Sequence, residues 1–217
     1  MKIRTAYELE ESIRHDITWR KKEFTTLKFM VTTKRKHERV ILLKAAITLL
    51  YSHWEGHVKH CSLAYLNYLN NIGCSFYKMK DNFLLLSVPD KFKKGFSFNN
   101  IASLSELMNY LNTPQTENFK VKEDYIIDTD SNLKFHILLN ILQQLGLETK
   151  DYELKEHFID AKLLKCRNAI AHGSILNEQE IEDTYNEIEN ELLNMILLFQ
   201  NLIFKAVNNK EYLRDAC

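Results

Sequence analysis

This chain of 217 residues contains few glycines and prolines and carries no net charge. Five glycines and two prolines leave few turn-forming residues, so the regular elements between them must be long. The 29 Lys and Arg residues balance the 29 Asp and Glu residues, so no net field draws the whole molecule onto nucleic acid. The composition therefore predicts a mostly helical protein, and the charge balance neither supports nor excludes an RNA substrate.

Paired cysteines and long apolar runs are also missing. The four cysteines, at positions 61, 74, 166 and 217, form no C-x-x-C pair, which argues against a zinc site and a compact disulfide framework. The N-terminus is charged where a signal peptide would be apolar, and no apolar run approaches the roughly 18 residues of a membrane span. We therefore expect a cytoplasmic protein with reduced thiols, no membrane contact, no metal and no other cofactor.

Apolar residues recur at every third or fourth position in five segments, which predicts five helices. The segments are residues 7–30, 38–73, 131–146, 152–173 and 177–209. Gly73 and Gly146 can end two of these helices, and Ser131 or Asn132 can cap the start of the third. The expected fold is an all-α bundle of about five helices, in a single domain that spans residues 1–217.

The periodicity weakens over residues 73–130, where both prolines lie. We interpret this stretch as an irregular insertion between the second helix and the later core helices. It contains a short helix candidate that begins at Ser103, with Glu106 three residues on as in a capping box. A short strand is possible at residues 83–88, although such a short apolar run is ambiguous.

The stretch "RNAIAHG" at residues 167–173 is the strongest candidate for chemistry. Asn168 and His172 are four residues apart and share a helix face, whereas Arg167 lies about 140° around the axis from His172. A long arginine side chain can cross that angle, so the three side chains can converge on one anion such as a phosphate. Alternatively, Arg167 and His172 simply complement the last carbonyls of a helix that ends at Gly173.

The same stretch, with histidine five positions after arginine and asparagine directly after the arginine, resembles the signature of the HEPN superfamily. The stretches "SHWEGHVK" (52–59) and "SNLKFHILLNILQQLGL" (131–147), and the last helix that closes on "NNKEYL", are together similar to the MAE-like HEPN subgroup of prokaryotes. The similarity covers nearly the whole chain in order and is weakest over 73–130. It implies a HEPN-type helical bundle, and many members of that superfamily are metal-independent ribonucleases.

The resemblance also implies roles for the motif residues. Metal-independent RNA cleavage needs a base, an acid and positive charge on the phosphorane-like transition state. His172 suits the proton transfers and Arg167 the charge, while Asn168 can orient the imidazole or bind the phosphate. One motif supplies one histidine for two proton transfers, so a symmetric homodimer with facing motif helices is implied. Some HEPN toxins carry a tyrosine two residues after the histidine, and in this chain that position is Ser174.

The implied activity is an endoribonuclease that cleaves RNA by 2′-hydroxyl transesterification. Its expected setting is a toxin or a phage-defence effector, with an antitoxin or a companion defence protein as a further partner. The alternative is a non-catalytic HEPN module that binds RNA or a nucleotide, or that acts as a scaffold.

The second helix carries an accessory set in which Tyr51, Glu55 and Lys59 recur at every fourth position. Glu55 and Lys59 can form an ordinary surface ion pair. In the functional interpretation, which comes from the resemblance, Glu55 instead hydrogen-bonds Arg167 or His172 and sets its geometry.

The same helix has histidines at positions 53, 57 and 60 around Gly56. No carboxylate triad accompanies them, so core or surface positions are expected for these histidines, and not metal ligation. Glycine inside a helix costs about 1 kcal/mol relative to alanine. Gly56 therefore predicts a close approach by another helix.

Cations and aromatic side chains alternate in the expected insertion. Three phenylalanines, at positions 92, 96 and 98, lie among three lysines. Single-stranded RNA is bound by such combinations of aromatic faces and positive charge. The predicted RNA contacts are Lys91, Lys93, Lys94 and Phe96. The alternative is that the phenylalanines pack under a solvated lysine rim.

Overall fold

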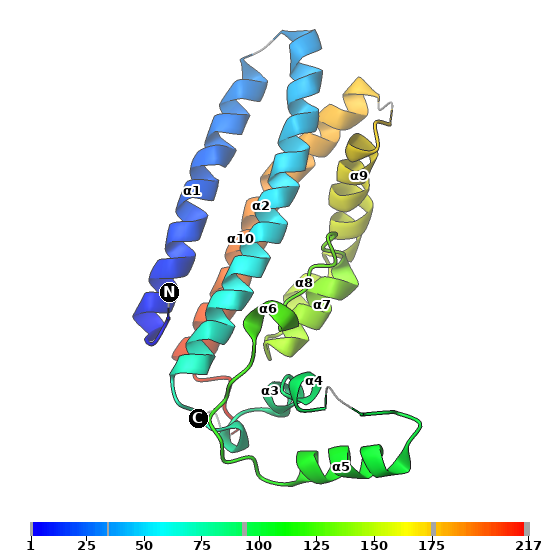
Figure 1. Cartoon of the computed structure of the whole chain (residues 1–217). Coiled ribbons are helices and arrows are strands. Elements are labelled where there is room, and N and C mark those ends of the chain that lie inside the picture. Colours follow the sequence, from blue (N-terminus) through cyan, green and yellow to red (C-terminus); the bar gives the residue numbers. More distant parts are fainter. Residues whose placement is uncertain (1, 34, 93–94, 175–176, 215–217) are drawn as a thin grey trace.

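A computed structural model describes residues 2–33, 35–92, 95–174 and 177–214 (Figure 1). Its regular elements are helices, and within these ranges the only β-type pairings are two isolated bridges. The long helices are α1 (Ala6–Thr32), α2 (Lys36–Asn71) and α10 (Glu178–Asn208). The predicted all-α class is confirmed. Among the described residues, no helix is both long enough and apolar enough to cross a membrane.

Helix α2 lies at the centre of the bundle, with α1 and α10 along it and α9 (Lys165–Ala171) on a further side (Figure 1). Apolar residues that recur at every third or fourth position along α2 are buried. They are Leu43, Ile47, Leu50, Trp54, Val58, Cys61, Tyr65 and Leu69. Burying such a stripe stabilises the helix by removing apolar surface from water.

Both predicted glycine terminators are confirmed. Gly73 (φ 69°) follows the end of α2, and Gly146 (φ 67°) follows the end of α7 (Phe135–Gln144). Glycine suits these positions because it has no Cβ to clash in the left-handed region. The predicted cap of α7 is wrong. The helix starts after Lys134, whose side chain makes no capping bond, and the Asn132 carboxamide instead accepts a hydrogen bond from Arg167.

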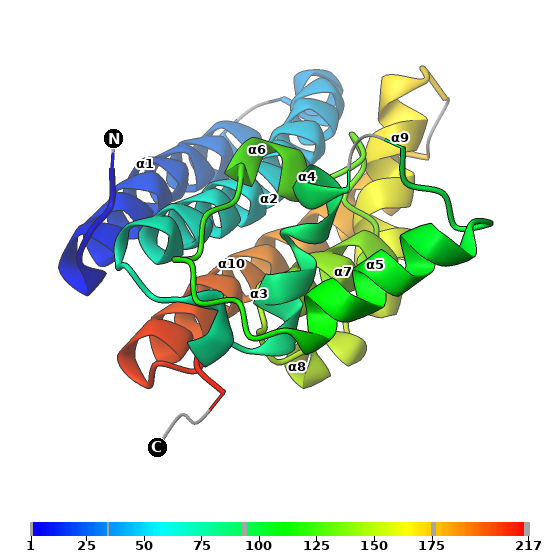
Figure 2. The same cartoon turned by 60° about the horizontal axis from the view of Figure 1, so that its bottom comes forward.

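The segment predicted as an insertion forms short elements at one end of the bundle (Figures 1 and 2). These elements are the 3₁₀ turn η1 (Phe76–Lys78) and the helices α3 (Asp81–Leu85), α4 (Val88–Lys91), α5 (Ile101–Asn112) and α6 (Glu123–Ile126). Two hydrogen bonds of 2.9 Å between the Asn70 side chain and the backbone of Val121 tie the end of this segment to α2. Its status as an insertion stays a prediction.

Two local predictions in this segment are wrong. The possible strand at residues 83–88 is helical over Phe83–Leu85, because Phe83 and Leu84 bury themselves from a single helical turn. Helix α5 is capped by Asn100 and not by Ser103, since the Asn100 carboxamide oxygen accepts from the backbone amides of residues 102 and 103. Asparagine is among the strongest N-cap residues, so the earlier start is favoured.

The single helix expected over residues 152–173 is divided. It consists of α8 (Lys150–Glu153), a turn, and the π-helix η2 (Phe158–Leu164), which runs directly into α9. The wider π turn lets Ile159, Leu163 and Leu164 all face the core. The Asp160 carboxylate in η2 accepts a hydrogen bond of 2.8 Å from the first backbone amide of α7.

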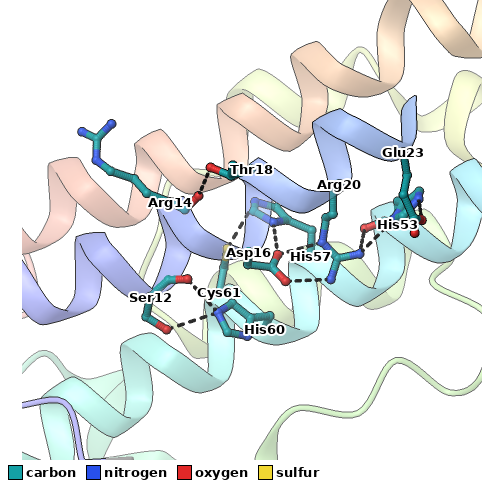
Figure 3. Close-up of polar contacts among 10 residues, drawn as sticks. All are labelled: Ser12, Arg14, Asp16, Thr18, Arg20, Glu23, His53, His57, His60 and Cys61. Atoms are coloured by element: carbon teal, nitrogen blue, oxygen red, sulfur yellow. Dashed lines mark hydrogen bonds and ion pairs between the residues drawn. The ribbon is translucent and has the colours of Figure 1, made fainter. Parts of the chain in front are cut away.

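A buried polar cluster joins α1 to α2 (Figure 3). The Arg20 guanidinium donates to both carboxylate oxygens of Asp16 at 2.7 and 3.0 Å, and to the backbone oxygen of His53 at 3.1 Å. The Asp16 carboxylate also lies 2.7 Å from His57 Nδ1. A Cβ at Gly56 would stand 3.2 Å from two Arg20 nitrogens. The predicted close approach at Gly56 is therefore made by the Arg20 side chain.

The charges of this cluster follow from burial and hydrogen bonding. Burial alone would raise the pKa of Asp16, but the bonds from His57 and Arg20 and the Arg20 charge hold it below its usual range. Burial is the main cause that lowers the pKa of His57, against the raising effect of Asp16. Burial and then the Arg20 charge lower the pKa of His53. The cluster is thus a charged Asp16–Arg20 pair beside two neutral histidines at neutral pH.

Removal of the carboxylate should be costly. Asp16→Ala should lower the free energy of unfolding by about 3–5 kcal/mol, because Arg20 would stay buried without its counterion. Glu10→Ala is the matched control, since its 3.4 Å contact with Arg14 on the same helix lies at the surface. It should cost less than about 1 kcal/mol. Urea denaturation followed by circular dichroism measures both, and equal losses would contradict the assignment.

Acid should weaken the fold through the same cluster. His57 has a lower pKa in the folded state than its unfolded value of about 6.5, so the unfolded chain binds the proton first. The free energy of unfolding should therefore fall as the pH is lowered from about 7 to 5. The lowered pKa of Asp16 acts in the same direction below its unfolded value of about 3.9. Urea titrations at several pH values should show a shallower dependence for His57→Gln. An unchanged dependence would exclude His57 as the cause.

Candidate functional site

One guanidinium on α9 is held by three separate parts of the chain. Arg167 is half-buried, and its Cζ lies 4.6 Å from the centre of the Tyr51 ring on α2. Its Nη1 donates to the side-chain oxygens of Asn168 at 2.7 Å and Asn132 at 2.9 Å. A cation over an aromatic face and two hydrogen bonds together restrict the guanidinium to one orientation.

The positive charge of Arg167 is not neutralised by a neighbouring acid. Among the described residues, no carboxylate lies within ion-pair distance of it, and both of its hydrogen-bond partners are uncharged carboxamides. Because both carboxamide oxygens face Nη1, the amide groups of Asn132 and Asn168 stay available as donors. A guanidinium with unused donors beside two such amides can bind a phosphate.

Tyr51 and Glu55 fix the neighbouring segment before α7. The Tyr51 hydroxyl accepts from the backbone amide of Leu133 at 2.7 Å, and the Glu55 carboxylate accepts from the Thr129 hydroxyl at 2.6 Å. Burial, and then the nearby Glu55 charge, raise the pKa of Tyr51, although Arg167 opposes the shift. Tyr51 is therefore a poor proton donor to a leaving group at neutral pH.

The structure differs from the expected role of Glu55, because this carboxylate contacts Thr129 and not Arg167 or His172. Its influence on Arg167 is indirect and passes through the segment before α7. Lys59, one turn further along α2, is exposed. Within the described ranges no hydrogen bond or ion pair joins Lys59 to this group. Of the three predicted accessory residues, Tyr51 contacts Arg167 directly, Glu55 is linked to it only through Thr129 and the segment before α7, and Lys59 has no hydrogen bond or ion pair with it among the described residues.

His172 is the C-cap residue of α9 and has an exposed side chain. Its backbone N–H donates to the Asn168 carbonyl at 2.9 Å, Gly173 is left-handed (φ 71°), and the Ser174 amide bonds to the Ala169 carbonyl at 2.9 Å. These bonds form a Schellman cap. The backbone of His172 therefore ends the helix, while the imidazole lies at the surface. In the described part of the chain, no hydrogen bond joins the imidazole to the guanidinium.

The aromatic residues of the predicted RNA-binding stretch pack on each other. Phe96 is half-buried between Phe92 and Phe98, with edge-to-face ring distances of 5.5 and 4.9 Å. Lys91 is exposed, and its ammonium lies 5.5 Å from the centre of the Tyr110 ring. This arrangement agrees with phenylalanines that pack under a lysine rim, and it leaves Phe98 as the most exposed ring, at 76%.

Lys93 and Lys94, the other two predicted cations, lie outside the described residues. The stretch itself leads into α5, at the opposite end of the bundle from the end of α9 (Figure 1). Of the predicted RNA contacts that the structure describes, Lys91 and Phe96 therefore do not lie together with the motif residues of α9.

The buried cluster between α1 and α2 contains a second arrangement with the form of a catalytic site. The Asp16 carboxylate contacts His57 Nδ1, and His57 Nε2 lies 3.3 Å from Cys61 Sγ (Figure 3). This is the order of an acid, a base and a nucleophile. However, His57 and Cys61 are fully buried, and burial raises the pKa of the Cys61 thiol. We assign this cluster to helix packing. The described residues also contain no group of three or more His, Cys, Asp or Glu side chains placed to hold a metal ion.

Sequence reasoning missed the roles of Thr129 and Asn132. It treated Asn132 as a helix cap, although the residue lies in the stretch 131–147 that carries part of the family resemblance. Their contacts are with residues 74 and 35 positions away in the chain. No local pattern reports such contacts.

Comparison with known proteins gives evidence on the family of the chain that is separate from this geometry. The RiboL-PSP-HEPN family profile matches residues 15–209, a range that holds α2, the segment before α7 and the whole motif. Neither the curated proteins nor the solved structures give a match. The family profile does not test the MAE-like subgroup, which stays a prediction. The match spans most of the chain, and the helical fold agrees with it, so the protein belongs to the RiboL-PSP-HEPN family of the HEPN superfamily.

Proposed function

We propose that this HEPN protein is a metal-independent endoribonuclease that cleaves RNA through the ribose 2′-hydroxyl. Membership in the family indicates a ribonuclease-like or RNA-binding function. The observation that supports binding of an RNA phosphate is Arg167, which is half-buried, held in one orientation, and without a carboxylate partner among the described residues. An uncompensated cation next to two amide donors is suited to an anionic ligand.

In the proposed reaction, the 2′-oxygen attacks the adjacent phosphorus while the bond from phosphorus to the 5′-oxygen breaks. Arg167 binds the non-bridging oxygens, whose charge increases in the transition state. An exposed imidazole such as that of His172 can take the proton from the 2′-hydroxyl or give one to the leaving 5′-oxygen. The products are a 2′,3′-cyclic phosphate and a 5′-hydroxyl. Asn168 would orient Arg167, because its side-chain oxygen is bonded to that guanidinium.

The second proton transfer requires a second histidine, which we propose comes from another copy of the chain. An apolar stripe on α2, formed by Ile41, Ala45 and Leu49, is exposed next to the turn that carries Tyr51. Ile41 is 70% exposed, so a partner that covered it would remove apolar surface from water. A second copy seated on this stripe would cover it, and the approach of that copy's motif helix to Arg167 is part of the proposal. A role as a toxin or defence effector, with an antitoxin or companion protein, is part of the same proposal.

Substitutions in the motif provide the direct test. Arg167→Ala and His172→Ala should each lower RNA cleavage by at least about 100-fold, because they remove transition-state charge and a proton-transfer group. The measurement is cleavage of total RNA by purified protein in excess chelator, with analysis of the product ends. Growth inhibition in cells, where present, should be lost with the cleavage.

Two variants on α1 serve as controls for these substitutions. Arg14→Ala and His15→Ala remove the same residue types from exposed positions, so cleavage should persist. Full cleavage by His172→Ala would refute the mechanism, and loss of wild-type cleavage in chelator would indicate a metal instead.

A charge placed on the apolar stripe should prevent the dimer. Ile41→Glu should shift the mass in solution from dimer to monomer and lower RNA cleavage, without loss of helical content, because residue 41 is exposed within the chain. Leu154→Glu is the matched control, since Leu154 is 91% exposed and lies in the turn after α8. Light scattering after size-exclusion chromatography gives the mass. A wild-type monomer that cleaves RNA would contradict the shared site.

One observation favours a second function, which is binding without cleavage. Within one chain, the anion-binding group around Arg167 is assembled, while the exposed His172 side chain is not joined to it by a described contact. A binding module would retain RNA on a filter in the presence of chelator and yield no cleavage products on long incubation.

A further inference from the structure

The segment from Asp128 to Leu133 has an unusual backbone. Asp130 (φ 51°) and Ser131 (φ 56°) are consecutive residues in the left-handed region, and neither is glycine. Side chains with a Cβ are disfavoured there, so such a pair persists only where other contacts hold it. Within the segment, the Asp130 amide donates to the Asp128 carboxylate at 2.9 Å, and further hydrogen bonds join the segment to α2 and α9.

Two hydrogen bonds from the segment to α2 hold it on either side of the left-handed pair. Before the pair, the Thr129 hydroxyl donates to the Glu55 carboxylate at 2.6 Å. After the pair, the Leu133 amide donates to the Tyr51 hydroxyl at 2.7 Å. Thr129 and Leu133 are both buried, so water does not compete easily for either bond.

Asn132 lies between these two attachment points, next to the left-handed pair. Its side-chain oxygen accepts the 2.9 Å hydrogen bond from Arg167 Nη1. Its backbone amide bonds to the Thr129 carbonyl at 3.1 Å, so the orientation of Asn132 depends on where Thr129 is held. A continuous set of hydrogen bonds therefore runs from Glu55 through Thr129 and Asn132 to the guanidinium.

Tyr51 contributes to both ends of this arrangement. Its hydroxyl holds Leu133, and its ring lies under the guanidinium of Arg167. A shift of the segment would therefore move the Asn132 side-chain oxygen away from the Arg167 guanidinium, which would stay on the Tyr51 ring. Arg167 would then keep only Asn168 as a hydrogen-bond partner on its own helix.

We propose that the segment from Asp128 to Leu133 is a latch that positions Arg167, with Asn132 as the positioning residue and the Thr129–Glu55 bond as the attachment that keeps it closed. Its effect on cleavage rests on the proposed function, whereas its effect on the Arg167 side chain does not. Opening the latch lets the left-handed pair relax and withdraws Asn132, which leaves a less ordered guanidinium. Regulation of the site through this segment would need no change in the core.

Two matched pairs of variants open or preserve the latch without touching Arg167 or Asn132. Thr129→Val removes the hydroxyl but keeps the shape, whereas Thr129→Ser keeps the hydroxyl. Ser131→Pro forces φ to about −65° and so forbids the left-handed conformation, whereas Ser131→Gly favours it. Ser131 is exposed, so both changes at this position leave the core intact. Thermal denaturation checks that each variant is folded.

Two readouts separate the latch from the chemistry. The first is NMR of the full chain, which follows exchange of the Leu133 amide and the Nε–H signal of Arg167. The second is the kinetics of RNA cleavage in chelator. Thr129→Val and Ser131→Pro should speed the exchange, alter the Arg167 signal and lower kcat by roughly 10- to 100-fold, with KM little changed. Thr129→Ser and Ser131→Gly should behave as the wild type.

The outcomes distinguish the two proposals. If the wild type cleaves RNA and both disruptive variants cleave at its rate, the latch is refuted and the proposed function stands. If the wild type does not cleave, the proposed function fails, and the latch is judged by NMR alone. Unchanged Leu133 exchange and an unchanged Arg167 signal in the disruptive variants refute the latch in either case. If one disruptive variant does not fold, the other decides by the same criteria.

Discussion

The packing of α2 against α1, α9 and α10 is the constraint on which the rest of the structure depends. Because α2 is covered on several sides, it contacts charged side chains on two of the helices that cover it. On the α1 side, Gly56 leaves space for the guanidinium of Arg20. On the α9 side, the ring of Tyr51 supports the guanidinium of Arg167. The stability of the bundle and the geometry of the candidate site therefore depend on the same helix.

The two arginines differ in a way that separates structure from function. Arg20 is buried and bonded to both oxygens of Asp16, so its charge is compensated inside the protein. Arg167 is only half-buried and is bonded to neutral carboxamides. Holding a cation in place without a counterion costs stability, and that cost is offset when an anion binds. This contrast is the reason why we propose Arg167, and not Arg20, as a ligand-binding residue.

Local patterns predicted the helices because burial repeats with the helical period, and they predicted the stops at Gly73 and Gly146 because glycine tolerates a left-handed backbone. The motif could be recognised from its residue types and spacing, while the common face of Asn168 and His172 stays a prediction. Local patterns predict Asn132 as a helix cap. They do not report its contact with Arg167, because that contact depends on how distant segments pack. The run at residues 83–88 was too short for its period to distinguish a strand from a helix.

The π-helix η2 affects how this chain should be compared with its relatives. A π turn holds more residues than an α turn, so η2 accommodates extra residues while the segments before and after it keep their positions. Asp160, inside the widened stretch, is bonded to the start of α7, and Arg167, beyond its C-terminal end, is bonded to Asn132, so the chain is held at both places. Relatives with an ordinary α turn at this place would be shorter between these two residues. An alignment that kept the spacing between Asp160 and Arg167 constant would then misplace the motif in such relatives. In a correct alignment with them we expect a small gap just before the motif.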